Sequence, residues 1–214
     1  RFFEDFAVGE EIVHATPRTI TSGDVAVYQS LFGSRFALTS ADTFAEALGY
    51  PRAPVDDLLT FHVVFGKTVP DISMNAIANL GYAEARFGAP VFPGDTLSSR
   101  SEVIGLRQTR DGKTGVVYVR TTGRNQRGEI VLAYVRWVLV RKRDVDSPAP
   151  ETVVPEPRSE VPPAELRVPF RKGPDYDLRL AGSPDLFEDY AVGEKIDHVD
   201  GVTIEEAEHM SACR

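Results

Sequence analysis

The order of apolar and polar positions predicts five strands and three helices in the first 142 residues. Strands are predicted at 11–21, 76–87, 96–108, 114–123 and 129–142, and helices at 22–30, 40–48 and 57–67. Pro-Gly, Asp-Gly and Arg-Gly pairs separate the last four strands, which is the spacing of an antiparallel meander. Apolar residues recur nearly all round the third helix, which predicts that it is buried on most sides: Leu58, Leu59, Phe61, Val63, Val64 and Phe65.

A long apolar helix followed by long antiparallel strands predicts an α+β fold in which the sheet wraps around a central helix. Asp56 or Asp57 is the expected N-cap of this helix, and His62 on it is expected to be a hydrogen-bonded core histidine. One face of the last strand is expected to lie on the helix: Val131, Ala133, Val135, Trp137 and Leu139. We expect such a unit to pair with a second one, edge strand to edge strand.

An internal repeat organises the chain. Residues 3–14, FEDFAVGEEIVH, recur without a gap at 187–198 as FEDYAVGEKIDH. Two copies of one pattern predict two similar domains that pack together. Nine of the fifteen prolines fall between 147 and 184, which predicts an extended connector. The predicted organisation is therefore a complete unit at 1–146, a proline-rich linker at 147–184 and the start of a second unit at 185–214.

Composition limits the classes of function. A net charge of −8 and a pI near 5.1 argue against a nucleic-acid partner, although a local basic pocket remains compatible with them. Cys213 is the single cysteine and cannot form an internal disulfide, which fits a reducing cytoplasm. No apolar run approaches the roughly 18 residues that span a bilayer, and no signal peptide opens the chain. These features predict a cytoplasmic protein without a membrane partner.

Several segments resemble a known family. The run LGYAEARFGAPVFPGDTL (Leu80 to Leu97) resembles the MaoC-like, R-specific enoyl-CoA hydratase branch of the hot-dog fold, as do FFEDFAVGEEI and EVIGLRQTRDGKTGVVYVRTTGRNQRGE. Within that branch, the doubled arrangement and the phrases NLGYAEARF and NQRGEIVLAYVRWVLVRKRD are similar to the mesaconyl-CoA hydratases, also called beta-methylmalyl-CoA dehydratases. The resemblance covers residues 2–144 and 186–214.

The resemblance implies the first unit of a double hot-dog and an acyl-CoA hydro-lyase. Reversible hydration of an enoyl-CoA needs a general base, a general acid and a donor for the thioester oxygen, which the family places at the start of the central helix. No metal or redox cofactor is implied, because the thioester already acidifies the alpha carbon. The implied partners are an acyl-CoA and either a second hot-dog unit or a homo-oligomer.

The catalytic motif of the family, G-D-x-N-P-x-H, is altered in this chain. Ser34 stands in the place of the Asp and Thr39 in the place of the His, and neither can act as a base near neutral pH without an adjacent activator. Asp56-Asp57 replaces the His-Gly that precedes the central helix in the family. The first unit is therefore predicted to be a degenerate copy that serves as scaffold and pocket wall, with its acid and base unassigned.

Other roles follow from single residues. Asp57, Leu58 and Arg124 are the expected substrate contacts, and His14 is expected to make a structural hydrogen bond. One alternative is a hot-dog acyl-CoA thioesterase in which Asp56 or Asp57 activates water. A second alternative is a non-catalytic unit that binds acyl-CoA or supports a partner. The sequence contains no cysteine or histidine spacing that suggests a metal site.

Overall fold

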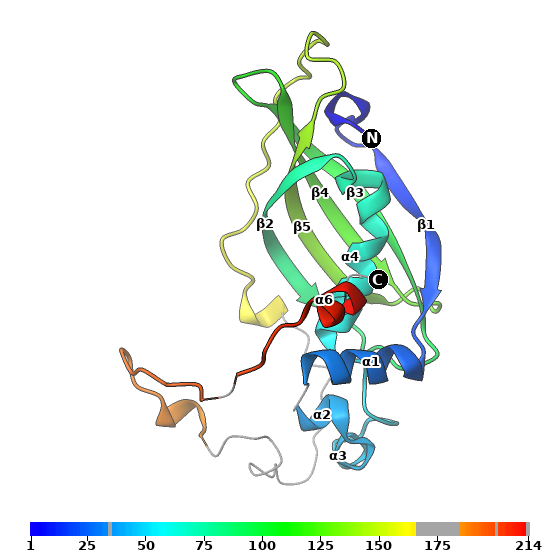
Figure 1. Ribbon diagram of the computed structural model, residues 1–214, viewed down its shortest axis with the longest axis vertical. Coiled ribbons are helices and arrows are strands. Elements are labelled where there is room, and N and C mark those ends of the chain that lie inside the picture. Colours follow the sequence, from blue (N-terminus) through cyan, green and yellow to red (C-terminus); the bar gives the residue numbers. More distant parts are fainter. Residues whose placement is uncertain (34–35, 166–184, 200, 213–214) are drawn as a thin grey trace. The chain divides into compact units, whose positions relative to one another are not determined.

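The computed structural model describes residues 1–33, 36–165, 185–199 and 201–212, so Ser34 lies outside the described residues (Figure 1). The chain divides into two compact units. The sheet unit comprises residues 1–21 and 55–169, and the helical unit comprises residues 22–54 and 170–214. The domain boundaries after 146 and after 184 stay predictions.

The sheet unit contains five antiparallel strands with nearly the predicted bounds: β1 (Glu11–Thr19), β2 (Ala76–Phe87), β3 (Thr96–Gln108), β4 (Thr114–Arg124) and β5 (Ile130–Arg141). Their order in the sheet is β1-β3-β4-β5-β2. The strands β3, β4 and β5 form the predicted meander, but β2 does not begin it. It pairs with β5, because β1 already occupies the other side of β3.

The helix α4 (Asp57–Thr68) packs on one face of this sheet and continues into the π-helical turn η2 (Val69–Ser73) (Figure 1). The side chain of Asp56 accepts a hydrogen bond from the Leu58 N–H at 2.8 Å, which confirms the predicted N-cap. A Cβ atom at Gly123 of β4 would lie only 2.6 Å from Cγ2 of Val64, so a glycine is needed where the helix meets the sheet. The predicted wrap of an antiparallel sheet around a helix is confirmed.

The prediction that α4 is buried on most sides is wrong. Its buried residues, such as Val63 and Val64, face the sheet, whereas Leu58 is 56% exposed. His62 is exposed as well, so it is not the predicted core histidine. The apolar pattern could not distinguish a helix enclosed by its own domain from a helix whose second side is left open.

The predicted inner face of β5 is also wrong, by one residue. Tyr134 and Arg136 face α4: Arg136 is fully buried, donates from Nη2 to Oγ1 of Thr68 at 3.1 Å and lies 4.6 Å above the Phe65 ring. Trp137 lies on the opposite face and stacks on Tyr118. Hydropathy alone assigns an arginine to solvent, but here a hydroxyl and an aromatic face contact the guanidinium and offset part of the cost of its burial.

The apolar core lies at one end of the sheet unit, where Phe3 of the short helix η1 (Phe3–Asp5) is completely buried. It packs in one cluster with Ile72, Val103 and Val138. A Cβ atom at Gly115 would lie 2.2 Å from the Phe3 ring, so the sheet has no side chain where this ring enters. The N-terminal segment therefore closes this end of the core.

The repeated sequence forms the same local structure twice. In η1 the Asp5 carboxylate accepts a hydrogen bond from the Phe2 N–H at 2.8 Å. In η4 (Phe187–Asp189) the Asp189 carboxylate accepts one from the Leu186 N–H at the same distance. The local conformation is therefore encoded by the repeated residues themselves.

The burial of the two copies differs completely. Phe3 is 0% exposed, whereas Phe187, its equivalent, is 89% exposed. The second copy thus keeps the local shape of the first, while its phenylalanine is exposed.

The helical unit contains α1 (Ser22–Phe32), α2 (Ala37–Ser40), α3 (Asp42–Ala47) and α6 (Glu206–Ala212). The first of these confirms the predicted helix at 22–30. The single helix predicted at 40–48 is replaced by α2 and α3, because Ala41 between them has an extended backbone with φ of −135°.

The Pro93-Gly94-Asp95 turn joins three parts of the sheet unit. Gly94 has a φ of 101°, which favours glycine, and the 5%-exposed Asp95 accepts hydrogen bonds from Phe92 N–H, Gln126 and Arg127 at 2.9, 2.6 and 3.1 Å. Burial acts to raise the pKa of the Asp95 carboxyl, but these hydrogen bonds outweigh it and hold the pKa below the usual value. The predicted turn is therefore also an anchor for the loop between β4 and β5.

The first prediction concerns this anchor. Asp95→Ala leaves three donors without their acceptor and should lower the free energy of unfolding by about 3 kcal/mol, and Asp95→Asn by less. Because the folded pKa is lowered, the carboxylate stabilises the fold above the unfolded value of 3.8, and this contribution is lost as the pH falls through the folded pKa. Urea unfolding of both variants between pH 3 and pH 7 measures the effect.

The matched control is Asp111→Ala in the exposed β3–β4 turn, where the carboxylate accepts hydrogen bonds from Thr109 and Lys113 in solvent and a smaller loss of about 1 kcal/mol is expected. Equal losses at positions 95 and 111 would contradict the anchoring role.

Candidate functional site

The N-terminus of α4 carries two adjacent carboxylates. The carboxylate of Asp56 caps the helix by accepting a hydrogen bond from the Leu58 N–H. Desolvation raises the pKa of the Asp57 carboxyl, and the neighbouring Asp56 charge raises it further. The positive end of a helix dipole ordinarily lowers the pKa of an acid, and the Asp56 charge acts in the opposite direction. Asp57 is therefore a carboxyl of raised proton affinity at the N-terminus of α4.

This arrangement is poorly suited to stabilising an enolate. An oxyanion site needs free N–H donors and a positive potential. Here the Leu58 N–H is already bonded, and Asp56 and Asp57 add negative charge at the same place. The predicted contacts Asp57 and Leu58 do lie together, but what they offer a ligand is an acid and an exposed apolar side chain.

Thr39 has a structural environment. It is largely buried, its hydroxyl donates to the Phe36 carbonyl at 3.2 Å, and its carbonyl accepts from Nε2 of Gln29 at 2.9 Å. Neither of these two partners is a base. Thr39 belongs to the helical unit and Asp57 to the sheet unit.

Arg124, the predicted cationic contact, is exposed at the end of β4. Its Nη1 donates to the Gly128 carbonyl at 2.6 Å and so holds the turn before β5. Arg127, in the same turn, pairs with Asp95 and Glu129. Both guanidinium groups thus have structural partners at this turn.

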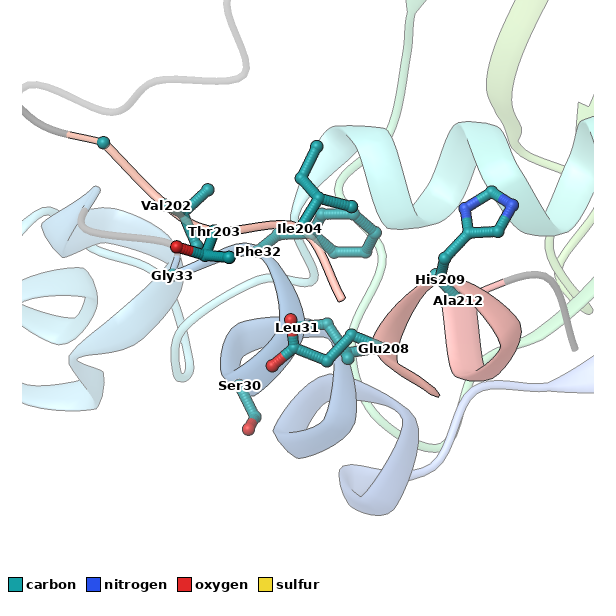
Figure 2. A pocket seen from close by; sticks show the side chains of 11 residues that line it. Ser30, Leu31, Phe32, Gly33, Val202, Thr203, Ile204, Glu208, His209 and Ala212 are labelled. Atoms are coloured by element: carbon teal, nitrogen blue, oxygen red, sulfur yellow. The ribbon is translucent and has the colours of Figure 1, made fainter. Parts of the chain in front are cut away.

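A hollow of about 740 Å³ lies in the helical unit (Figure 2). The end of α1 with the following Gly33 forms one part of its lining, and residues 201–204 with one side of α6 form the other. Glu208 and His209 leave α6 in different directions in Figure 2, so they do not form an acid–base pair. The sequence could not reveal this hollow, because its two linings lie about 170 residues apart.

A buried polar chain crosses the sheet beneath α4. His14 is 3% exposed, with Nδ1 2.7 Å from Oδ2 of Asp71 and Nε2 2.9 Å from Oγ of Ser101, which is bonded in turn to Thr121. Burial lowers the pKa of His14, and the Arg136 charge lowers it further against the opposing effect of Asp71. Both ring nitrogens are engaged, so the predicted structural hydrogen bond is confirmed.

The described ranges also lack the features of two other classes of site. No group of three or more His, Cys, Asp or Glu side chains in these ranges has an arrangement that could hold a metal ion. None of the helices in the same ranges has both the length and the apolar character needed to cross a membrane.

Comparison with known proteins gives a consistent result. Residues 5–125 match the family described as MaoC like domain. The chain is 68% identical, over its whole length, to beta-methylmalyl-CoA dehydratase of Chloroflexus aurantiacus and covers 61% of that protein. It is 60% identical, again over its whole length, to mesaconyl-CoA hydratase of Cereibacter sphaeroides and covers 63% of it. The chain thus spans about three-fifths of these relatives.

Solved structures agree on the fold. A MaoC domain protein dehydratase from Chloroflexus aurantiacus aligns with a TM-score of 0.95 and 68% identity, covering 99% of this chain and 61% of that one. A Mycobacterium tuberculosis protein described as a double hot-dog aligns with a TM-score of 0.67 and 25% identity over 84% of this chain and 59% of that one. The predicted hot-dog fold, as part of a double hot-dog, is confirmed.

The second prediction concerns His14. Its folded pKa lies below the ordinary value of 6.5, so the neutral ring stabilises the fold above that pH, and stability is lost as the pH falls from there through the folded pKa. Urea unfolding of wild type and His14→Gln between pH 5 and pH 8 should show this decline in wild type and a weaker one in the variant. The exposed His62→Gln serves as the control and should keep the full decline. Identical pH profiles for wild type and His14→Gln would count against a buried neutral imidazole.

Proposed function

Because this chain belongs to the MaoC-like domain family, we propose that the protein is an acyl-CoA hydro-lyase that reversibly hydrates an enoyl-CoA of the mesaconyl-CoA or beta-methylmalyl-CoA type. The observation that carries this proposal is the high identity, along all of this chain, to two relatives that bear these names. A CoA thioester as substrate supports a cytoplasmic location, and the chemistry requires no metal or redox cofactor because the thioester itself acidifies the alpha carbon.

In this proposal the first repeat is mainly scaffold and pocket wall. Hydration needs a base to take a proton from water and an acid to protonate the alpha carbon. Thr39 supplies neither, and the capped, doubly acidic start of α4 is a poor site for an enolate. The reactive groups are therefore assigned to a second hot-dog unit.

The open edge of the sheet supports pairing with such a unit. β2 is an edge strand, and Ile77, Leu80 and Tyr82 on it are 50%, 46% and 41% exposed. An edge strand with exposed apolar side chains is a template for another strand. Leu58 on the open side of α4 adds to the apolar surface that a partner would cover.

A thioesterase is the second candidate, because Asp57 is an exposed carboxyl beside the capping Asp56 at the start of α4 and its pKa is raised. A carboxyl with raised proton affinity is a better general base for water than an ordinary one. Thioester hydrolysis releases free CoA thiol, whereas hydration does not, so one assay separates the two functions.

The third prediction tests the reaction. The full-length protein should remove the enoyl-thioester absorbance of mesaconyl-CoA without releasing thiol. If neither mesaconyl-CoA nor crotonyl-CoA loses absorbance, the hydro-lyase proposal fails. Thiol release from a panel of acyl-CoAs that disappears in Asp57→Asn would establish the thioesterase instead.

The fourth prediction tests the scaffold role. Thr39→Val keeps the shape of the side chain. Removal of a general acid or base lowers kcat by roughly 100-fold or more, so Thr39→Val and Asp57→Asn should each lower kcat for hydration by much less than that. Circular dichroism of both variants checks folding. A 100-fold loss in kcat with an intact fold would place catalysis in the first repeat.

A further inference from the structure

The start of the proline-rich segment is docked on the sheet. Residues 147–165, here called the strap, belong to the sheet unit, and in Figure 1 their yellow trace runs past the sheet down to η3 (Pro163–Glu165). Val153 and Leu106 of β3 exchange two backbone hydrogen bonds, each 2.9 Å long. A Cβ atom at Gly105 would lie 2.5 Å from the Val153 carbonyl oxygen and 2.6 Å from Cδ of Pro155. The strap therefore lies directly on the backbone of β3.

Beside Gly105 the strap reaches the outer face of the sheet, opposite α4. The Cβ atom built at Gly105 also approaches Tyr118, whose ring stacks on Trp137, and both rings lie on the face that α4 does not cover. Prolines keep such a segment extended before it docks, so little chain entropy is lost when it binds.

A buried lysine holds the beginning of the strap. Lys142, at the end of the sheet, is 7% exposed, and its Nζ donates to the carbonyl oxygens of Ser147 and Val145 and to Oε1 of Gln108 at 2.7, 3.2 and 3.2 Å. One ammonium group thus ties the turn that leads into the strap to β3.

The far end of the strap is held by the bulge in β2. Glu84 has a φ of 54° and is the one non-glycine residue with positive φ among the described residues. Its carboxylate accepts a hydrogen bond from the Arg158 backbone N–H at 3.0 Å. Arg86, two residues further along β2, pairs with Glu165 at 2.9 Å, and Glu165 also binds Arg158. A strained backbone of this kind persists where surrounding contacts hold it.

We propose that the strap is a positioning element for the second repeat and that Glu84 is the residue that locks it. The strap is held at both ends: Lys142 binds its start, and Glu84 and Arg86 of β2 bind its end. Because β2 is the open edge strand, the docked strap brings the chain to the edge at which we propose that the second hot-dog unit pairs.

The physical gain is effective concentration. A tether that starts next to its binding site raises the local concentration of the attached domain, whereas a free tether also allows exchange with another molecule. This inference rests on the proposed pairing of two hot-dog units. It extends that proposal by assigning the geometry of pairing to the segment NLGYAEARF, which contains Glu84 and Arg86.

Three substitutions at Glu84 separate the hydrogen bond from the backbone strain. Glu84→Gln keeps an acceptor for the Arg158 N–H and serves as the matched control. Glu84→Ala removes the acceptor and keeps the unfavourable φ, whereas Glu84→Gly removes the acceptor and relieves the strain. Hydrogen exchange of the full-length protein reports docking at Val153 and Arg158, and pairing at residues 77–82 of β2.

Glu84→Ala and Glu84→Gly should raise exchange at Arg158 and Val153 by roughly tenfold, and Glu84→Gln should stay close to wild type. Exchange at residues 77–82 should rise in the same two variants. Gly105→Ala places a Cβ atom against the Val153 carbonyl oxygen in the middle of the strap and should reproduce both effects.

Unchanged exchange at Val153 and Arg158 in both Glu84→Ala and Gly105→Ala would overturn the locking role. A strap that opens while residues 77–82 keep wild-type protection would overturn the positioning role. Hydration by the wild-type protein is measured separately, so failure of the proposed reaction leaves the exchange result decisive for the strap.

Discussion

The contact between α4 and the inner face of the sheet is the constraint on which the sheet unit depends. At its centre Val64 lies where a side chain on β4 would otherwise stand, because position 123 is glycine. Any larger residue there would lift the helix and separate Thr68 and Phe65 from Arg136. A fully buried guanidinium would then lose its compensating contacts, and an uncompensated buried charge is strongly destabilising. One glycine thus decides whether a polar interior can be tolerated.

That interior favours one strand register over others. His14, Ser101, Thr121 and Arg136 come from four different strands and lie beneath the same helix. A shift of any strand by one residue would turn its polar side chain to the other face and break the chain of hydrogen bonds. An all-apolar interior would bind the helix without this penalty for misalignment. The polar residues therefore contribute more to the uniqueness of the fold than to its net stability.

The sequence predicted the strands and the central helix well, because alternation and turn residues are local signals. It failed where a tertiary partner decides the outcome. Arg136 is assigned to solvent by its charge, and only Thr68 and Phe65 on another element make its burial possible. The position of β2 beside β5 likewise depends on β1, which lies far away in sequence. At the candidate site, the departure from the family motif at Thr39 was visible in the sequence. The raised pKa of Asp57 and the lock at Glu84 depend on surroundings that no spacing encodes.

A repeat that serves as scaffold, as we propose for this one, still has a physical role. The sheet unit folds around its own apolar core at Phe3, yet it leaves Leu58 on α4 and Ile77 on β2 exposed. Exposing these apolar side chains to water is unfavourable. We propose a second hot-dog unit as the partner, because its own edge strand and helix would match them. Phe187 in the second copy also has an unburied apolar side chain, because it has the local structure of Phe3 without its burial. In a paired arrangement one copy can lose its base while the wall that it provides remains necessary. Selection would then act on Gly123, Arg136 and Glu84 rather than on Thr39, since the first three hold the shape that the other copy uses.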